Sequence, residues 1–193
     1  MRMSLLINSG YCFTLALMIL LLPLSWIMPA VLGAFIHEMC HYLAILACSR
    51  KSAQVGLHSF AARMNLPEMG RGKELFCALA GPVGGLCLVL LAPWFPRLAL
   101  CAGAQSLYNL LPVYPLDGGR ALRCLLHLFF APSVAEIAEA LITWITIGAL
   151  ILLSIYGAFY LDLGFLPLLA SVILVFRAND AKMPCKAMQF EVQ

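Results

Sequence analysis

Five consecutive residues in the first quarter of the chain have the types and spacing of a metal-dependent hydrolase. His37-Glu38-Met39-Cys40-His41 has the form HExxH. Side chains four positions apart on a helix point the same way, so the two imidazoles can bind one Zn²⁺ ion. The glutamate between them can then act on a water molecule as a general base. The motif therefore predicts His37 and His41 as metal ligands and Glu38 as the catalytic base.

A catalytic zinc site also needs a third protein ligand and an open position for water. Among the remaining acids and histidines, Asp117 stands out because it ends an apolar run within NLLPVYPLDGGR, residues 109–120. The prolines and glycines of this segment predict a broken helix. At membrane depth, such backbone must be buried in protein or line a wet cavity, which suits a metal ligand. The alternative is an ordinary Asp-Gly turn.

The chain around these motifs has the composition of a membrane protein. Hydrophobic residues make up 63% of it and charged residues only 11%, against about 45–50% and about 25% in soluble domains. From residue 3 to residue 49, His37, Glu38 and His41 are the only ionisable side chains apart from cysteine and tyrosine. An acid inside a bilayer costs about 2.5–3.5 kcal/mol, so this cluster indicates a functional site. The alternative is a hydrogen-bonded polar patch that joins helices.

The elements that must position these residues are helices that cross the membrane. As one helix, residues 3–49 would be about 70 Å long, against a hydrocarbon core of about 30 Å. A break is therefore expected between Pro23 and Pro29. We predict an all-α membrane protein of six transmembrane helices, with a broken helix at the second motif and a small β-hairpin within residues 53–66. The expected spans are 8–28, 30–48, 75–95, 98–116, 134–156 and 160–176.

The basic residues predict the orientation of these spans. With a cytoplasmic N-terminus, all of the 12 Lys and Arg residues except Arg97 fall in cytoplasmic segments, as the positive-inside rule requires. We expect one membrane domain over residues 1–177, a cytoplasmic tail over 178–193, and a multi-pass protein of a bacterial cell membrane with both termini in the cytoplasm. No basic run suits nucleic acid, and the eight cysteines form no CxxC pair that would suggest a thiolate zinc site.

The two motifs together resemble those of the site-2 protease family of intramembrane zinc metalloproteases. HExxH in one span and NLLPVYPLDGGR in a later one match the paired motifs of that family, and the sequence Ala80-Gly81-Pro82 resembles a further recurrent element. The resemblance covers roughly residues 30–130. The compact six-span layout looks most like the bacterial subgroup that includes the stage IV sporulation protein FB.

The resemblance implies an intramembrane zinc endopeptidase that cuts in or near a transmembrane segment of a membrane-tethered protein and releases a cytoplasmic regulatory factor. His37, His41 and Asp117 would hold Zn²⁺, and Glu38 would be the base and later the proton donor. The resemblance alone assigns Asn109 to the substrate or the developing oxyanion. Expected partners are the lipid bilayer, the substrate and a membrane regulatory protein. The hairpin would receive an unwound substrate strand.

Two other functions fit the same residues. In a metal transporter, the intramembrane histidines and carboxylate would form a transit site, although the inverted repeat expected of many transporters is not visible. In a catalytically inactive relative, the site would bind membrane partners without cutting them, although Glu38 is present. Gly81, Gly84 and Gly85 are expected to allow close helix packing. Glu136 and Glu139 are expected to cap or solvate the start of the fifth span.

Overall fold

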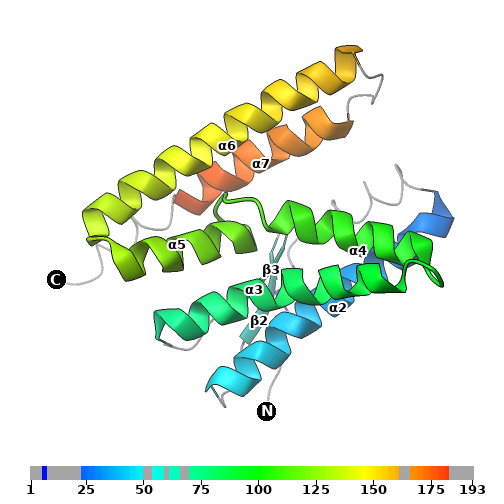
Figure 1. The fold of residues 1–193 in the computed structure, drawn as a ribbon, viewed down its shortest axis with the longest axis horizontal. Coiled ribbons are helices and arrows are strands. Elements are labelled where there is room, and N and C mark those ends of the chain that lie inside the picture. Colours follow the sequence, from blue (N-terminus) through cyan, green and yellow to red (C-terminus); the bar gives the residue numbers. More distant parts are fainter. Residues whose placement is uncertain are drawn as a thin grey trace. The chain divides into compact units, whose positions relative to one another are not determined.

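The computed structural model describes residues 6–7, 23–49, 54–58, 61–65, 70–160 and 166–182. The chain divides into two compact units, residues 1–109 and residues 110–193 (Figure 1). Most of the described residues are helical.

The first unit is built on three helices that all pack on one another. They are α2 (Leu24–Ser49), α3 (Arg71–Cys87), which continues into the 3-10 turn η1 (Leu88–Leu91), and α4 (Pro96–Asn109). Small residues allow the helices to approach closely, as in other membrane bundles. At the crossing of α2 and α4, a Cβ added to Gly33 would lie 3.4 Å from the Cα of Ala102. The helix that carries HExxH is thus held between α3 and α4.

Three short strands accompany these helices, in the order β1-β2-β3. They are β1 (Leu6–Ile7), β2 (Gln54–His58) and β3 (Ala61–Asn65). β2 pairs antiparallel with β3 and parallel with β1. β2 is therefore the central strand, and β3 lies at one edge of the described sheet.

The second unit contains α5 (Asp117–Phe129), α6 (Pro132–Tyr160) and α7 (Leu166–Lys182). α5 packs on α6, and α6 runs beside α7 (Figure 1). The hydroxyls of Ser154 on α6 and Ser171 on α7 are buried and lie 2.9 Å apart. Each hydroxyl is also within hydrogen-bonding distance of the carbonyl four residues earlier in its own helix. This contact joins α6 and α7 without an ionised group.

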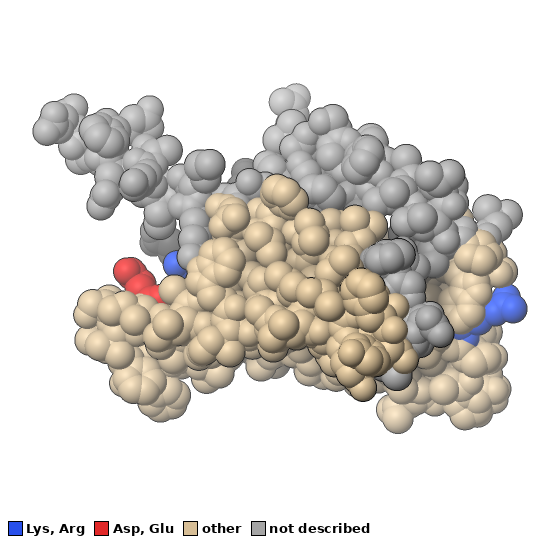
Figure 2. Space-filling view, turned by 90° about the horizontal axis from the view of Figure 1, so that it is seen from above, with Lys and Arg blue, Asp and Glu red and all other residues tan. Residues whose placement is uncertain are grey.

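Three helical segments among the described residues are long and apolar enough to cross a membrane: Ser25–Ser49, Arg71–Leu91 and Pro132–Tyr160. Pro167–Phe176 is a shorter apolar segment. Large apolar side chains on these elements face outward, among them Leu90 at 77% exposure and Phe159 at 74%. Over the described residues of the face in Figure 2, uncharged side chains cover most of the surface. Apolar exposure on this scale marks a surface that meets another phase or partner.

Several predicted boundaries differ from the structure. The second expected span, 30–48, starts too late, because α2 begins at Leu24 and continues through Pro29; residues 8–22 of the first expected span lie outside the described residues. The expected span 98–116 was wrong in extent. The helix α4 ends at Asn109, and its 14 residues reach only about 21 Å. The six spans therefore stay a prediction.

The segment 117–133, expected to be a cytoplasmic loop, contains the helix α5. α5 is amphipathic: it buries Ala121 and Cys124, while Leu125 and Leu128 remain exposed. At the end of the described chain, α7 begins at Leu166 rather than near 160, and it passes through the predicted division at residue 177.

Candidate metal centre

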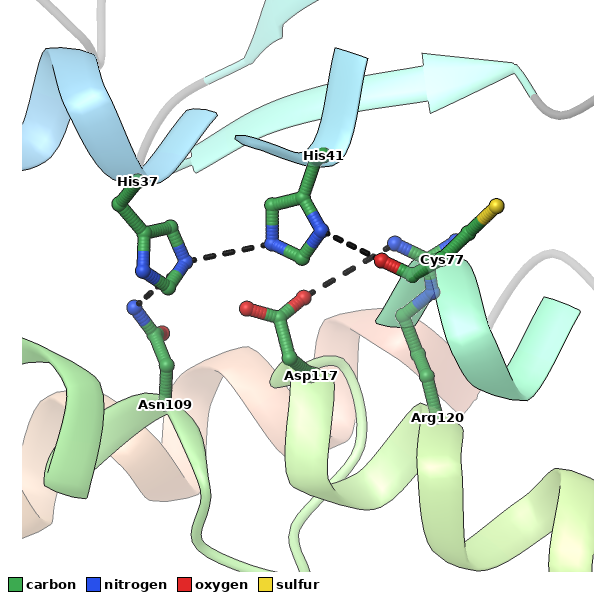
Figure 3. Close-up of polar contacts among 6 residues, drawn as sticks. All are labelled: His37, His41, Cys77, Asn109, Asp117 and Arg120. Atoms are coloured by element: carbon green, nitrogen blue, oxygen red, sulfur yellow. Dashed lines mark hydrogen bonds and ion pairs between the residues drawn. The ribbon is translucent and has the colours of Figure 1, made fainter. Parts of the chain in front are cut away.

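The two histidines of HExxH lie one turn apart on α2 and face each other. Both are buried, His37 at 2% and His41 at 6% exposure. Their Nε2 atoms are 3.2 Å apart (Figure 3). Two nitrogen ligands at 2.0–2.1 Å from one tetrahedral zinc ion would be separated by roughly 3.3–3.4 Å. The pair therefore has the spacing of two ligands on one ion.

The second nitrogen of the His41 ring is held by α3. Its Nδ1 atom lies 2.7 Å from the backbone carbonyl oxygen of Cys77 (Figure 3). A carbonyl oxygen can only accept a hydrogen bond, so Nδ1 must carry the proton. In the neutral ring the lone pair is then on Nε2, the atom that faces His37. Metal-ligating histidines usually have such a second partner, which fixes the tautomer and the ring orientation.

Three glycines on α3 bring its backbone against neighbouring side chains. A Cβ added to Gly81 would lie 2.7 Å from Cε1 of His41 and closer still to Cδ2 and Nε2. A Cβ at Gly84 would overlap the Cys40 thiol, and one at Gly85 would overlap the Ser106 hydroxyl. These contacts confirm the prediction that the three glycines allow close helix packing. They also show that one of them touches a predicted metal ligand.

Asn109 is the last residue of α4, and its side chain reaches the same histidine pair. Its Nδ2 atom lies 3.4 Å from Nε2 of His37 (Figure 3). Glu38 follows His37 on α2 and is half-buried. The first unit thus brings together His37, His41 and Asn109 as the sequence interpretation expected, whereas the roles of Asn109 and Glu38 stay predictions.

The second motif forms the non-helical connection between α4 and α5, which confirms the predicted break. Residues 110–116 contain a cis peptide bond between Tyr114 and Pro115. Gly118 and Gly119 lie directly against this loop. A Cβ added to Gly118 would overlap the backbone of Leu110, and one added to Gly119 would overlap the backbone of Val113 and Tyr114. Only residues without a side chain allow the loop to fold back onto the first turn of α5.

Asp117 is the first residue of α5. Its carboxylate lies 4.0 Å from the guanidinium of Arg120, one turn later (Figure 3). The Asp117 side chain is 13% exposed. A carboxylate at a helix N-terminus is favoured by the helix dipole. Asp117 is therefore held at the end of the loop as a largely buried anion.

Arg123, on α5, contacts both the loop and α6. Its Nε atom lies 3.1 Å from Oε2 of Glu139 on α6, and its guanidinium lies 5.0 Å from the centre of the Tyr114 ring. Glu139 was expected to solvate the start of a span, and this was wrong because the side chain is 12% exposed and pairs with Arg123. Sequence reasoning missed Arg123, since only the fold brings it near both partners.

His37 and His41 supply two imidazoles and Asp117 supplies one carboxylate, which are donor types that a metal ion could take. Two imidazoles and one carboxylate are typical of a catalytic zinc site, whereas Mg²⁺ and Ca²⁺ prefer oxygen ligands alone. The residues therefore fit the ion that the sequence predicted.

Comparison with solved structures identifies the fold. The structure of the Site-2 Protease from Methanocaldococcus jannaschii matches with a TM-score of 0.63 over 89% of this chain and 85% of that chain. The chain has the fold of a site-2 protease. The two sequences are 20% identical, so the likeness concerns the fold alone. No protein-family model and no curated protein sequence matches the chain.

Proposed function

We propose that the chain is an intramembrane zinc endopeptidase of the site-2 protease family. The observation that carries the proposal is the histidine pair. Two buried Nε2 atoms lie 3.2 Å apart on a helix that is long and apolar enough to cross a membrane. Ionisable side chains within a membrane span are costly, so a buried pair of imidazoles there indicates a functional site. The fold of a site-2 protease supports the same activity.

We assign Asp117 as the third ligand. The loop folds so closely that Gly118 lies against the backbone of Leu110, which is bonded to Asn109. Asn109 lies beside His37. The chain itself therefore restricts how far Asp117 can lie from the histidine pair. Three protein ligands leave a fourth position for water or substrate.

The residues of the site have distinct roles in peptide hydrolysis. When bound, zinc polarises the scissile carbonyl and lowers the pKa of water toward about 7. Glu38 takes a proton from the attacking water and gives it to the leaving amine. Asn109 donates a hydrogen bond to the carbonyl oxygen as negative charge develops there. The Cys77 carbonyl keeps the His41 ring in one tautomer throughout.

The depth of the site on α2 indicates where a substrate would be cut. About 12 Å of helix separates His41 from Ser49, and about 16 Å separates His37 from Trp26. At the Ser49 end, Lys73 donates to the Cys48 carbonyl at 3.3 Å.

At the other end of the first unit, the guanidinium of Arg97 lies 5.8 Å from the Trp26 ring centre. Tryptophan with a basic partner is typical of a membrane interface. The Lys73 end is, in this proposal, cytoplasmic, and the substrate is a membrane-tethered protein cut inside its span, releasing a cytoplasmic factor.

An extended substrate is needed, because a helix hides its carbonyl groups from attack. In this proposal, an unwound substrate segment adds to the edge of the sheet at β3, since strand addition satisfies its backbone groups. Six spans with both termini in the cytoplasm, a bacterial cell membrane and a membrane regulatory protein also belong to the proposal. The likeness to the stage IV sporulation subgroup stays a prediction, because the structural comparison concerns the fold.

Metal analysis and cleavage of a single-span model substrate test the proposal together. Glu38→Gln should retain zinc and lose cleavage, because the base is lost and the ligands are not. Asp117→Ala should lose both. Glu136→Gln, the same change at an exposed position on α6, should lose neither.

Two results would count against the proposal. Normal zinc content and normal cleavage in Asp117→Ala would show that Asp117 is not the third ligand. A zinc-loaded wild type that cuts none of several membrane substrates would favour the catalytically inactive alternative.

A further inference from the structure

One turn of α3, from Cys77 to Gly81, meets the His41 ring at two places. The Cys77 carbonyl lies 2.7 Å from Nδ1. One turn later, Gly81 has no side chain, and the opposite edge of the His41 ring fills the space that a Cβ would take. Both α3 residues are buried, Cys77 at 2% exposure. The ring is therefore oriented by a hydrogen bond on one side and by close backbone contact on the other.

We propose that this turn of α3 is the positioning element of the metal centre and that Gly81 is a positioning residue for zinc binding. The inference rests on the proposed function, because it concerns a ligand of the proposed ion. A bond to Nδ1 fixes the rotation and the tautomer of a metal-binding histidine, and its loss typically lowers metal affinity about 10- to 100-fold. Any side chain at position 81 would force the ring away from the Cys77 carbonyl or force α3 away from α2.

The other two glycines of α3 separate this role from packing in general. Gly84 lies against Cys40, which is also on α2, and Gly85 lies against Ser106 on α4. An alanine at position 84 requires the Cys40 thiol to rotate away, and its Cβ would still lie 3.0 Å from the Cβ of Cys40. An alanine at position 85 crowds a hydroxyl that is fully buried. Neither neighbour is a proposed ligand, so both substitutions crowd the bundle without touching the His41 ring.

Zinc affinity of the full-length chain tests the proposal independently of cleavage. Metal-free wild type, Gly81→Ala, Gly84→Ala and Gly85→Ala would be compared by competition with a chromogenic chelator, and thermal unfolding in detergent would report the fold. We expect the zinc affinity of Gly81→Ala to fall about 10- to 100-fold. Gly84→Ala and Gly85→Ala should keep wild-type affinity, even where their melting temperatures fall as far as that of Gly81→Ala. Equal affinity in Gly81→Ala and Gly84→Ala would overturn the assignment.

The tautomer of His41 provides a second measurement that needs no variant of α3. In metal-free wild type labelled with ¹⁵N-histidine, we expect a protonated Nδ1 and an unprotonated Nε2 at His41, with signals assigned by substitution of the other three histidines one at a time. The opposite tautomer would overturn the proposal even if Gly81→Ala fails to fold. A wild type that binds no zinc would overturn the proposed function instead, and the nitrogen spectrum would still decide the role of the Cys77 carbonyl.

Discussion

The substitution Gly118→Ala tests how the fold holds Asp117. Gly118 is the second residue of α5 and is buried. An added Cβ would overlap the carbonyl groups of Leu110 and Leu111. These are backbone atoms, so they cannot rotate away as a side chain can. An alanine must therefore displace either the loop or the first turn of α5, and Asp117 lies where the two join.

The expected magnitude follows from a comparison with Gly148→Ala. Gly148 lies within α6, and nothing would lie within 4 Å of a Cβ added there. In a helix, alanine is favoured over glycine by about 1 kcal/mol, and both substitutions gain this term. Overpacking costs about 1–3 kcal/mol, and only Gly118→Ala incurs it. We therefore expect Gly118→Ala to be about 1–3 kcal/mol less stable than Gly148→Ala.

The same displacement should lower the zinc affinity. A loss of 1.4 kcal/mol in binding corresponds to about tenfold in affinity, and we expect Gly118→Ala to lose at least that much zinc affinity while Gly148→Ala loses none. Denaturant unfolding in detergent and chelator competition would measure the two quantities on the same preparations. If Gly118→Ala matches Gly148→Ala in stability, the backbone contact does not constrain the loop. If stability falls and zinc affinity does not, Asp117 is not a ligand.

Three further predictions concern other contacts. Arg123→Ala should lower the free energy of unfolding by about 0.7–2 kcal/mol, since it removes a partly exposed ion pair worth about 0.2–1 kcal/mol and a cation–π contact worth about 0.5–1 kcal/mol. A double-mutant cycle with Glu139→Gln should isolate the ion pair, and zero coupling would contradict it. A Ser154→Ala, Ser171→Ala cycle should give a coupling of about 0.6 kcal/mol for the α6–α7 hydrogen bond, whereas additive effects would argue against that bond. Leu57→Pro should disrupt β2 and slow cleavage without releasing zinc, and unchanged turnover would argue against strand addition.

The proposed ligands were accessible to sequence reasoning because the patterns that suggest them are local. HExxH depends only on helix periodicity, and the prolines and glycines of the second motif predict a broken backbone wherever they occur. The structure confirms a break within the second motif: α4 ends at Asn109, short of the expected residue 116, and α5 begins at Asp117. Within the first unit, it also brings Asn109 beside His37.

The surroundings of the ligands were not accessible in this way. Every residue has a backbone carbonyl, so the sequence does not single out that of Cys77. Gly81 was recognisable only as a small residue in an apolar helix. Glu139 was misread because its partner lies 16 positions away in the chain and on another helix. The pairing of β1 with β2 likewise joins segments on either side of α2. Each of these contacts depends on tertiary structure rather than on local pattern.

The positioning of His41 suggests why an intramembrane site would use backbone rather than side chains around its ligands. Another ionisable group beside the ring would have to be desolvated, which is costly in an apolar bundle. The Cys77 carbonyl is already present in α3, and a carbonyl oxygen has two lone pairs, so it can accept from His41 as well as from its own helix. Gly81 contributes space and no polar atom. By contrast, Arg123, which contacts the Tyr114 ring of the loop and pairs with Glu139, has a side chain that is 42% exposed and can remain partly solvated. The buried turn of α3 thus uses backbone contacts beside His41, whereas the partly exposed Arg123 uses an ion pair. We therefore predict that replacing Gly81 by any polar residue will weaken zinc binding more than replacing it by alanine.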